Sequence, residues 1–150
     1  MDSRSLALLG ARLLLAQLFL LGSAQKWLDP AAVEGLLAGR GWPDWLIWPA
    51  LGFNLAAGLL LALGLWTRPL AVLLAAYCAV TSLFHFIPGD GWQMSIFVKN
   101  WAIAGGCLAL AAAGPGRYAV GGTVGAGVPK DPRPDDVRAA PAPSARRSPP

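Results

Sequence analysis

Long apolar stretches alternate with short polar breaks along most of the chain. Four stretches are long enough to cross the hydrocarbon core of a bilayer, which takes about 20 residues of α-helix. They cover approximately residues 6–25, 46–66, 70–87 and 95–113. Backbone groups in lipid must be hydrogen-bonded within their own segment, so each stretch is expected to be a helix. The pattern predicts an all-α fold, an integral membrane four-helix bundle over residues 1–113.

The connection after the first span is longer than the others and contains a helix signal of its own. Asp29 and Pro30 suit the N-cap and the first position of a helix. Four apolar residues follow at helical spacing: Ala32, Val33, Leu36 and Leu37. We interpret this segment as a short amphipathic helix at the membrane interface. By contrast, the turn at residues 67–69 is tight, which predicts that the second and third spans are antiparallel neighbours.

Composition agrees with a membrane setting. Hydrophobic residues make up 55% of the chain and charged residues only 13%, whereas soluble domains usually contain about 25% charged residues. A small soluble domain could not bury this much apolar surface. The net charge of +4 comes largely from the chain ends and indicates topology and attraction to anionic lipid. No basic stripe with interleaved aromatic residues occurs, so no nucleic-acid partner is expected.

The distribution of lysine and arginine predicts the orientation, because these residues favour the cytoplasmic side. An N-terminus inside places Arg4, Arg68 and Arg117 on that side with the C-terminal tail, and leaves Lys26 and Arg40 outside. Tryptophans at the outer ends of the spans would then form an aromatic belt: Trp27, Trp42, Trp45, Trp48 and Trp92. The prediction is a multi-pass protein of the bacterial cytoplasmic membrane with both termini in the cytoplasm.

The first span has a second interpretation as a signal peptide. Gly22-Ser23-Ala24 resembles a small-residue cleavage site. However, Arg12 interrupts the apolar run that a signal peptide needs, and cleavage would leave three spans with the ends on opposite sides. We therefore interpret the span as an uncleaved helix.

Residues 114–150 differ from the rest of the chain. They are rich in proline, alanine and basic residues and have almost no large apolar side chains. Such a segment buries too little to offset its ordering entropy, so it is expected to be a disordered cytoplasmic tail. Its charge could touch anionic lipid, or the tail could simply be solvated.

The two cysteines, Cys78 and Cys107, both lie inside apolar runs and form no CxxC motif. We interpret each as a small buried hydrophobic residue. A redox pair between spans is the alternative, and it would require the two Cα atoms to come within about 7 Å.

Polar residues inside the spans are candidates for function because they are costly in lipid. At 100° per residue, the spacing predicts two polar stripes that face the bundle. The first span contributes Arg12, Phe19, Ser23 and Lys26, and the third contributes Tyr77, Thr81 and His85.

Four polar residues and two neighbours fall in the outer half of the predicted bundle. The four are Lys26, Asn54, His85 and Lys99, and the neighbours are Gln93 and Asn100. We expect them to converge on one polar pocket with apolar walls, which would suit the polar head of a quinone or a small anion. Each also has a plain structural alternative. The lysines can snorkel to the interface, the Asn54 amide can join two helices, and His85 can cap a helix.

Signals for known catalytic chemistry are absent from the sequence. It contains no Ser-His-Asp set, phosphate loop, carboxylate pair, haem motif or metal-ligand spacing. The second, third and fourth spans contain no acidic residue, which argues against a proton relay of the Asp/Glu kind. No catalytic residue is assigned, and no metal is expected.

With these residues in place, the chain resembles the DoxX family of small bacterial membrane proteins. The matching elements are Arg12…Phe19…Gly22…Lys26, Gly58…Gly64, Thr67-Arg68, Ser82-Leu83-Phe84-His85, Gln93…Lys99-Asn100 and Gly114-Pro115-Gly116-Arg117-Tyr118. The resemblance covers about residues 5–120. It implies a four-helix inner-membrane bundle, and some relatives are subunits of thiosulfate:quinone oxidoreductase or associate with redox or detoxification complexes. One departure is Asn54, where many members carry an acid.

Three functional hypotheses follow. The first is an accessory or quinone-interacting subunit of a membrane-associated redox system, with quinone as the candidate cofactor and a redox enzyme as partner. Such a subunit would not be catalytic alone. The second is a membrane scaffold that recruits a partner protein through its tail or helix faces. The third is a small-molecule carrier, which would need a homo-oligomer because four helices enclose little space.

Overall fold

The computed structural model of the protein describes residues 2–120, and residues 121–150 of the expected tail lie outside this range. The described elements, in chain order, are α1 (Ser3–Leu28), α2 (Pro30–Ala38), the short 3-10 helix η1 (Asp44–Leu46), α3 (Ile47–Leu63), α4 (Thr67–Phe84) and α5 (Gly91–Ala113). Four helical segments are long and apolar enough to cross a membrane: α1, α4, α5 and the continuous unit Asp44–Leu63. The predicted all-α, four-span fold is confirmed, as is the short helix after the first span.

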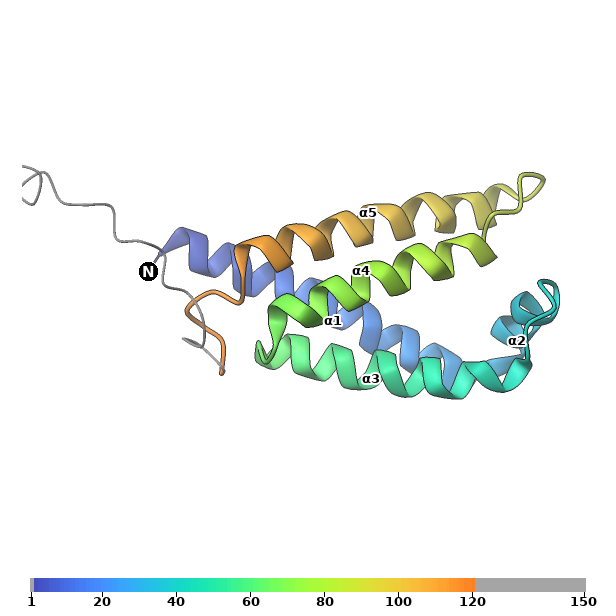
Figure 1. Cartoon of the computed structure of the whole chain (residues 1–150), viewed down its shortest axis with the longest axis horizontal. Helices are drawn as coiled ribbons and strands as arrows, with labels where there is room; N and C mark the ends of the chain where they lie inside the picture. The colour runs from blue at the N-terminus through green and yellow to red at the C-terminus, as the bar shows by residue number, and fades with distance from the viewer. Residues whose placement is uncertain (1, 121–150) are drawn as a thin grey trace, which may run out of the picture.

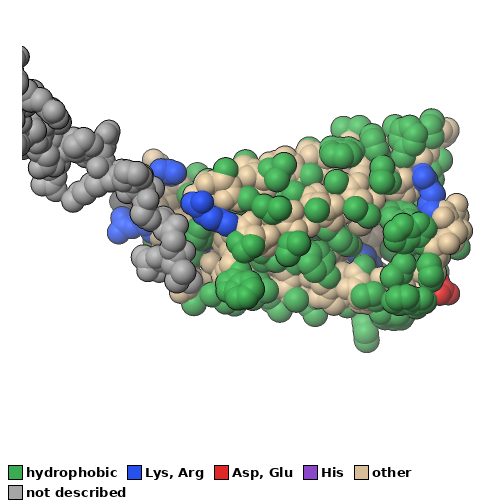
Figure 2. Space-filling model, in the orientation of Figure 1, with side chains coloured by type: hydrophobic (Ala, Val, Ile, Leu, Met, Phe, Trp, Pro, Cys, Tyr) green, Lys and Arg blue, Asp and Glu red, His purple; other side chains and the backbone are tan. Residues whose placement is uncertain are grey.

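The outer surface of the bundle is apolar along its length. Figure 2 shows apolar side chains over most of the visible face, with the charged side chains mainly at its two ends. Many large apolar residues are exposed at positions in the middle of the helices, including Leu14, Leu59, Val72, Leu73 and Leu108. A soluble protein of this size would not expose so continuous an apolar surface. This apolar surface is therefore the part of the protein that contacts lipid.

The four long helices form two tight pairs. α1 packs mainly against α3, and α4 packs mainly against α5, with fewer contacts between the pairs. The pairs lie close together where the chain begins and diverge toward the end where α2 lies (Figure 1). We name these the terminal end and the α2 end. Although α3 and α4 are joined by a short turn and are antiparallel neighbours, each therefore has its main packing partner elsewhere.

The turn between α3 and α4 differs from the predicted boundaries. Gly64 adopts φ +76° and ends α3 at Leu63, and Trp66 adopts φ 49° just before α4. Helix α4 already begins at Thr67 and ends at Phe84, whereas the apolar pattern placed this span at residues 70–87. Pro69 looks like a turn residue in the sequence. In the first turn of a helix, however, a missing N–H costs nothing, so the helix can include it.

Helix α5 begins at Gly91, earlier than the predicted residue 95. The reason is Asp90, whose Oδ1 accepts hydrogen bonds from the backbone N–H groups of Trp92 at 2.9 Å and Gln93 at 3.1 Å. These bonds satisfy two of the free donors at the helix start. Asp2 caps α1 in the same way, because its Oδ1 accepts from the N–H of Arg4 at 3.1 Å. Side-chain caps thus lengthen both helices beyond their apolar runs.

The polar stripe predicted on α1 faces the bundle. Arg12, Phe19 and Ser23 are all buried. The Arg12 guanidinium donates to the carbonyl oxygens of Ala62 at 3.0 Å, Pro115 at 2.7 Å and Tyr118 at 3.0 Å. It therefore satisfies a free carbonyl at the end of α3 and holds residues 114–120 of the expected tail against the terminal end of the bundle.

Candidate functional site

A cavity of about 650 Å³ lies between the two helix pairs at the α2 end. Its lining comes from α1, α2, α3, α4 and α5 together. The walls are mostly apolar, with Leu18, Phe19, Ile47, Ile96 and Ile103 among the lining residues. This volume falls within the ~300–1,000 Å³ that is usual for small-molecule sites. The divergence of the helix pairs therefore leaves a ligand-sized space.

All six residues predicted to converge line this one cavity: Lys26, Asn54, His85, Gln93, Lys99 and Asn100. They come from four different helices or their ends, which places them around the space rather than along one wall. Asn54 is buried and Lys99 is exposed, and the other four are half-buried. The convergence expected from helix depth is thus present in the geometry.

Gly22 makes room between two of these polar side chains. A Cβ atom at Gly22 would lie 3.6 Å from Asn54 Nδ2 and 3.8 Å from Lys26 Nζ. Lys26 Nζ itself donates to the carbonyl oxygen of Gly22 at 3.2 Å, so this ammonium group turns back along α1. Because an ammonium group has three protons, Lys26 keeps donors for another acceptor.

Asn54 carries a buried acceptor without a partner. Its side chain is 3% exposed, and no described group donates a hydrogen bond to Oδ1. Leaving a buried polar atom unsatisfied costs about 1–3 kcal/mol. Asn54 is among the residues that line the cavity.

His85 and Gln93 form a hydrogen-bonded pair across the turn between α4 and α5. Nδ1 of His85 lies 2.7 Å from Oε1 of Gln93. An amide oxygen only accepts, so the ring N–H on Nδ1 donates to Oε1. Gln93 therefore fixes the orientation of the imidazole at the cavity.

The cavity is basic. Its lining includes two lysines and one histidine, and none of the described lining residues is Asp or Glu. No carboxylate in the described lining therefore balances the charge of the two lysine ammonium groups. Water-poor surroundings strengthen the attraction of such groups for acceptors and anions. Among the described residues, no group of three His, Cys, Asp or Glu side chains could hold a metal ion.

Helix α2 lines one side of the same cavity, a role that the sequence did not reveal. Its apolar residues Ala32, Val33, Leu36 and Leu37 all contribute to the lining. The segment that follows α2 is fastened to α4. The guanidinium of Arg40 donates to the carbonyl oxygen of Phe86 at 2.8 Å, and the rings of Trp42 and Phe84 meet edge to face at 5.2 Å.

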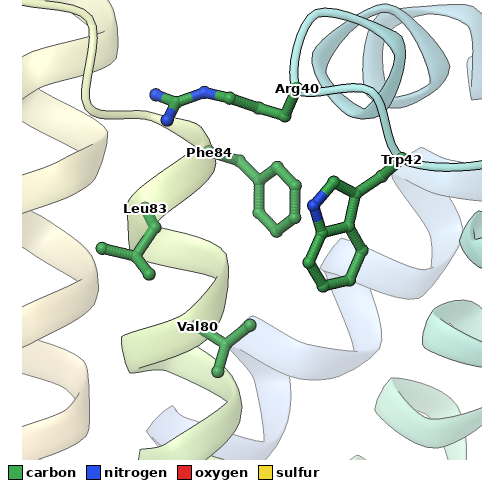
Figure 3. Close-up of a pocket in the computed structure, with 5 residues that line it drawn as sticks. All are labelled: Arg40, Trp42, Val80, Leu83 and Phe84. Atoms are coloured by element: carbon green, nitrogen blue, oxygen red, sulfur yellow. The ribbon is translucent and has the colours of Figure 1, made fainter.

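Figure 3 shows this attachment, with the Trp42 indole against Phe84 and Val80 below them. The same residues, with Arg40 and Leu83, surround a smaller cavity of about 280 Å³. Trp42 also lines the large cavity. The sequence signal for this role of α2 was the amphipathic spacing in residues 32–37, because the apolar face of a short connecting helix has to pack against lipid or against the rest of the protein.

The cysteines lie in the core of the bundle. Both Cys78 and Cys107 are free thiols and buried among core residues of α1, α3, α4 and α5. Cys78 also reaches the lining of the large cavity, whereas Cys107 does not. The interpretation of both as small buried residues agrees with this placement.

Four apolar spans around a basic, ligand-sized cavity define a small multi-pass membrane protein. The DoxX family model matches residues 7–86, more than half of the chain. The chain belongs to the DoxX family. Inner membrane protein YqjF of Escherichia coli (strain K12) is 31% identical over 111 residues, which cover 73% of this chain and 85% of that protein.

Inner membrane protein YphA of the same organism is 34% identical over 126 residues, covering 79% of this chain and 90% of its own length. Both relatives are described as inner membrane proteins, which agrees with the four apolar spans. No solved structure gives a significant match to this chain.

Proposed function

We propose that the protein binds the head group of a lipid-soluble quinone in the large cavity and acts as an accessory subunit of a membrane redox system. The observation that carries this proposal is the convergence of Lys26, Asn54, His85 and Lys99 on one cavity with apolar walls. The ammonium groups donate to the carbonyl oxygens of the head, and the apolar walls accept the ring and the start of its chain.

The cavity favours a quinone over a small inorganic anion because most of its lining is apolar. A small anion would leave this apolar space unfilled, whereas a ring with a hydrocarbon chain fills it. The chain of such a ligand can leave toward the lipid between the two helix pairs, where contacts are few. A partner enzyme would reduce or oxidise the bound quinone, because no catalytic group is assigned in this protein.

The binding proposal is tested with the purified chain in lipid nanodiscs. Decylubiquinone is titrated by isothermal calorimetry into the unmodified protein and into Lys26→Ala and Lys99→Ala. Loss of one charge-assisted hydrogen bond should weaken binding by about tenfold. Arg68→Ala is the matched control, since this exposed residue lies in the first turn of α4 at the terminal end and does not line the cavity. Equal affinity in all four proteins contradicts the proposal.

The partner is tested separately by native purification in mild detergent and mass spectrometry of what remains bound. A retained redox enzyme supports the accessory role. A scaffold would instead lose its partner when residues 121–150 are deleted, and substitutions that weaken quinone binding would not affect this partner. A carrier would move ligand across liposomes without any partner enzyme.

A further inference from the structure

The positive charge of the large cavity is not balanced by the ligand of the proposed function. Lys26 and Lys99 line the cavity, and none of the described lining residues is Asp or Glu. A neutral quinone accepts hydrogen bonds from the ammonium groups but leaves their charges uncompensated. A charge within a membrane protein is costly unless an opposite charge accompanies it. The lining therefore favours an anionic head group.

Two hydrogen-bond donors lie close together at Gly22, which is itself a lining residue. Asn54 Nδ2 lies 3.6 Å and Lys26 Nζ lies 3.8 Å from the position that a Cβ atom at Gly22 would take. Apart from the backbone of α1 and the chain neighbours of Gly22, no other described atom lies within 4 Å of this position. Nδ2 carries two amide hydrogens, and Nζ keeps two hydrogens beyond the one it gives to the Gly22 carbonyl. The geometry therefore favours a ligand group that only accepts hydrogen bonds.

We propose that the cavity binds the ionised carboxylate of a long-chain fatty acid as a second ligand. One carboxylate oxygen accepts from Lys26 Nζ and the other from Asn54 Nδ2, since the two oxygens of a carboxylate can accept from separate donors. The negative charge compensates the Lys26 ammonium group. The acyl chain packs against the apolar walls, which include Leu18, Ile47 and Ile103.

A single acyl chain fits this cavity better than other membrane or cellular anions do. A small inorganic anion would leave the apolar part of the space empty, and a phospholipid would bring two chains into about 650 Å³. The fatty acid and the quinone would occupy the same space, so free fatty acid in the bilayer would regulate quinone binding by exclusion. The inference goes beyond the proposed function and does not depend on it, because the charge and the donors belong to the lining alone.

The test measures binding of tritiated palmitate to the full-length protein in phosphatidylcholine nanodiscs by scintillation proximity, with empty nanodiscs as the background. The buffer is mildly alkaline, so that the fatty acid is ionised. Unlabelled palmitate should displace the label at a concentration about tenfold lower than hexadecanol, which has the same chain length but no charge. This comparison uses the unmodified protein and does not depend on the folding of a variant.

Variants assign the carboxylate to Lys26 and Asn54. Lys26→Gln keeps a hydrogen-bond donor but removes the charge, and it should raise the dissociation constant for palmitate about tenfold. Asn54→Leu removes the second donor and should raise this constant by about the same factor, because a hydrogen bond to a charged group is lost. Arg68→Gln is the matched control. It also removes one positive charge, but Arg68 is exposed and does not line the cavity, so its affinity for palmitate should equal that of the unmodified protein.

Equal displacement by palmitate and hexadecanol overturns the inference, as does palmitate binding no greater than that of empty nanodiscs. An unchanged affinity in Lys26→Gln, or an equal loss in Arg68→Gln, overturns it as well. Competition with decylubiquinone separates the two proposals. Palmitate binding that depends on Lys26 but is not reduced by decylubiquinone supports this inference and contradicts the proposed function. Decylubiquinone binding without palmitate binding does the reverse.

Discussion

Arg12 and Pro115 stand 103 residues apart in the chain, yet Nη1 of Arg12 donates to the carbonyl oxygen of Pro115 at 2.7 Å. The same guanidinium reaches Ala62 and Tyr118 and is only 1% exposed. One side chain therefore joins the first helix, the end of α3 and the segment after α5.

We expect Arg12→Met to lower the free energy of unfolding by about 3 kcal/mol, because three carbonyl oxygens lose a charged donor. Arg12→Lys should have a smaller effect, since an ammonium keeps the charge but lacks the planar fork. Thermal unfolding in detergent measures both. Limited proteolysis should also cut more readily near residue 115 in Arg12→Met. Unchanged unfolding and cleavage would show that these contacts do not stabilise the protein.

Two glycines should respond in opposite ways to alanine. At Gly64, φ is +76° and a Cβ would lie 2.5 Å from Ala119 Cβ and 2.6 Å from Arg12 Nη1, so Gly64→Ala should destabilise by about 1–3 kcal/mol. Gly52 lies inside α3 with nothing within 4 Å of the added atom. Gly52→Ala should stabilise by about 0.5–1 kcal/mol. The comparison uses the same unfolding assay, and the same sign at both positions contradicts it.

Gly22→Ala should separate stability from binding. The added methyl group meets its neighbours only at ordinary contact distances of 3.6 and 3.8 Å, and alanine favours a helix by about 1 kcal/mol over glycine. The fold should therefore be as stable as before or more so. Decylubiquinone binding should weaken, because the methyl group occupies the point between Asn54 and Lys26. Unweakened binding in a stable variant would place the ligand elsewhere.

Trp42→Ala should loosen α2 from the bundle. The substitution removes the edge-to-face contact with Phe84, which is worth about 0.5–1.5 kcal/mol beyond the buried area. Hydrogen exchange in residues 30–41 should become faster, and a bound ligand should dissociate faster because α2 lines the cavity. Trp66→Ala is the control, since Trp66 is exposed at the terminal end. Equal exchange in both variants would contradict a holding role for Trp42.

The predicted orientation can be measured by labelling intact cells with a membrane-impermeant maleimide. The background protein carries Cys78→Ala and Cys107→Ala. A single cysteine from Asp90→Cys should react from outside, whereas one from Arg117→Cys should react only after the cells are opened, because basic ends remain in the cytoplasm. The reverse pattern would place the α2 end in the cytoplasm.

Most of the fold could be predicted from the sequence because lipid restricts a spanning segment to a helix. The apolar runs therefore located all four spans. Their ends were less accurate, because they depend on individual groups such as the Asp90 cap and the left-handed backbone at Gly64. A hydropathy pattern contains no information about such contacts, and it placed Pro69 in the turn rather than in α4.

The polar lining of the cavity followed from helix depth and from the direction of each span. The pairing of the helices did not, because the pattern shows which face is polar but not which helix covers it. The role of α2 was missed for the same reason. The three carbonyl partners of Arg12 could not be predicted either, since every residue has a backbone oxygen and the sequence does not show which ones lie near the guanidinium.

The position of Arg12 has a consequence for how the protein is made. Arg12 is synthesised near the beginning, whereas Pro115 and Tyr118 emerge more than 100 residues later. The pair α1–α3 can assemble as soon as residue 63 has entered the bilayer, and α4–α5 follows. Until then the guanidinium lacks two of its three acceptors, which is unfavourable within a membrane. The terminal end can therefore be completed only after the four spans from α1 to α5 have been synthesised.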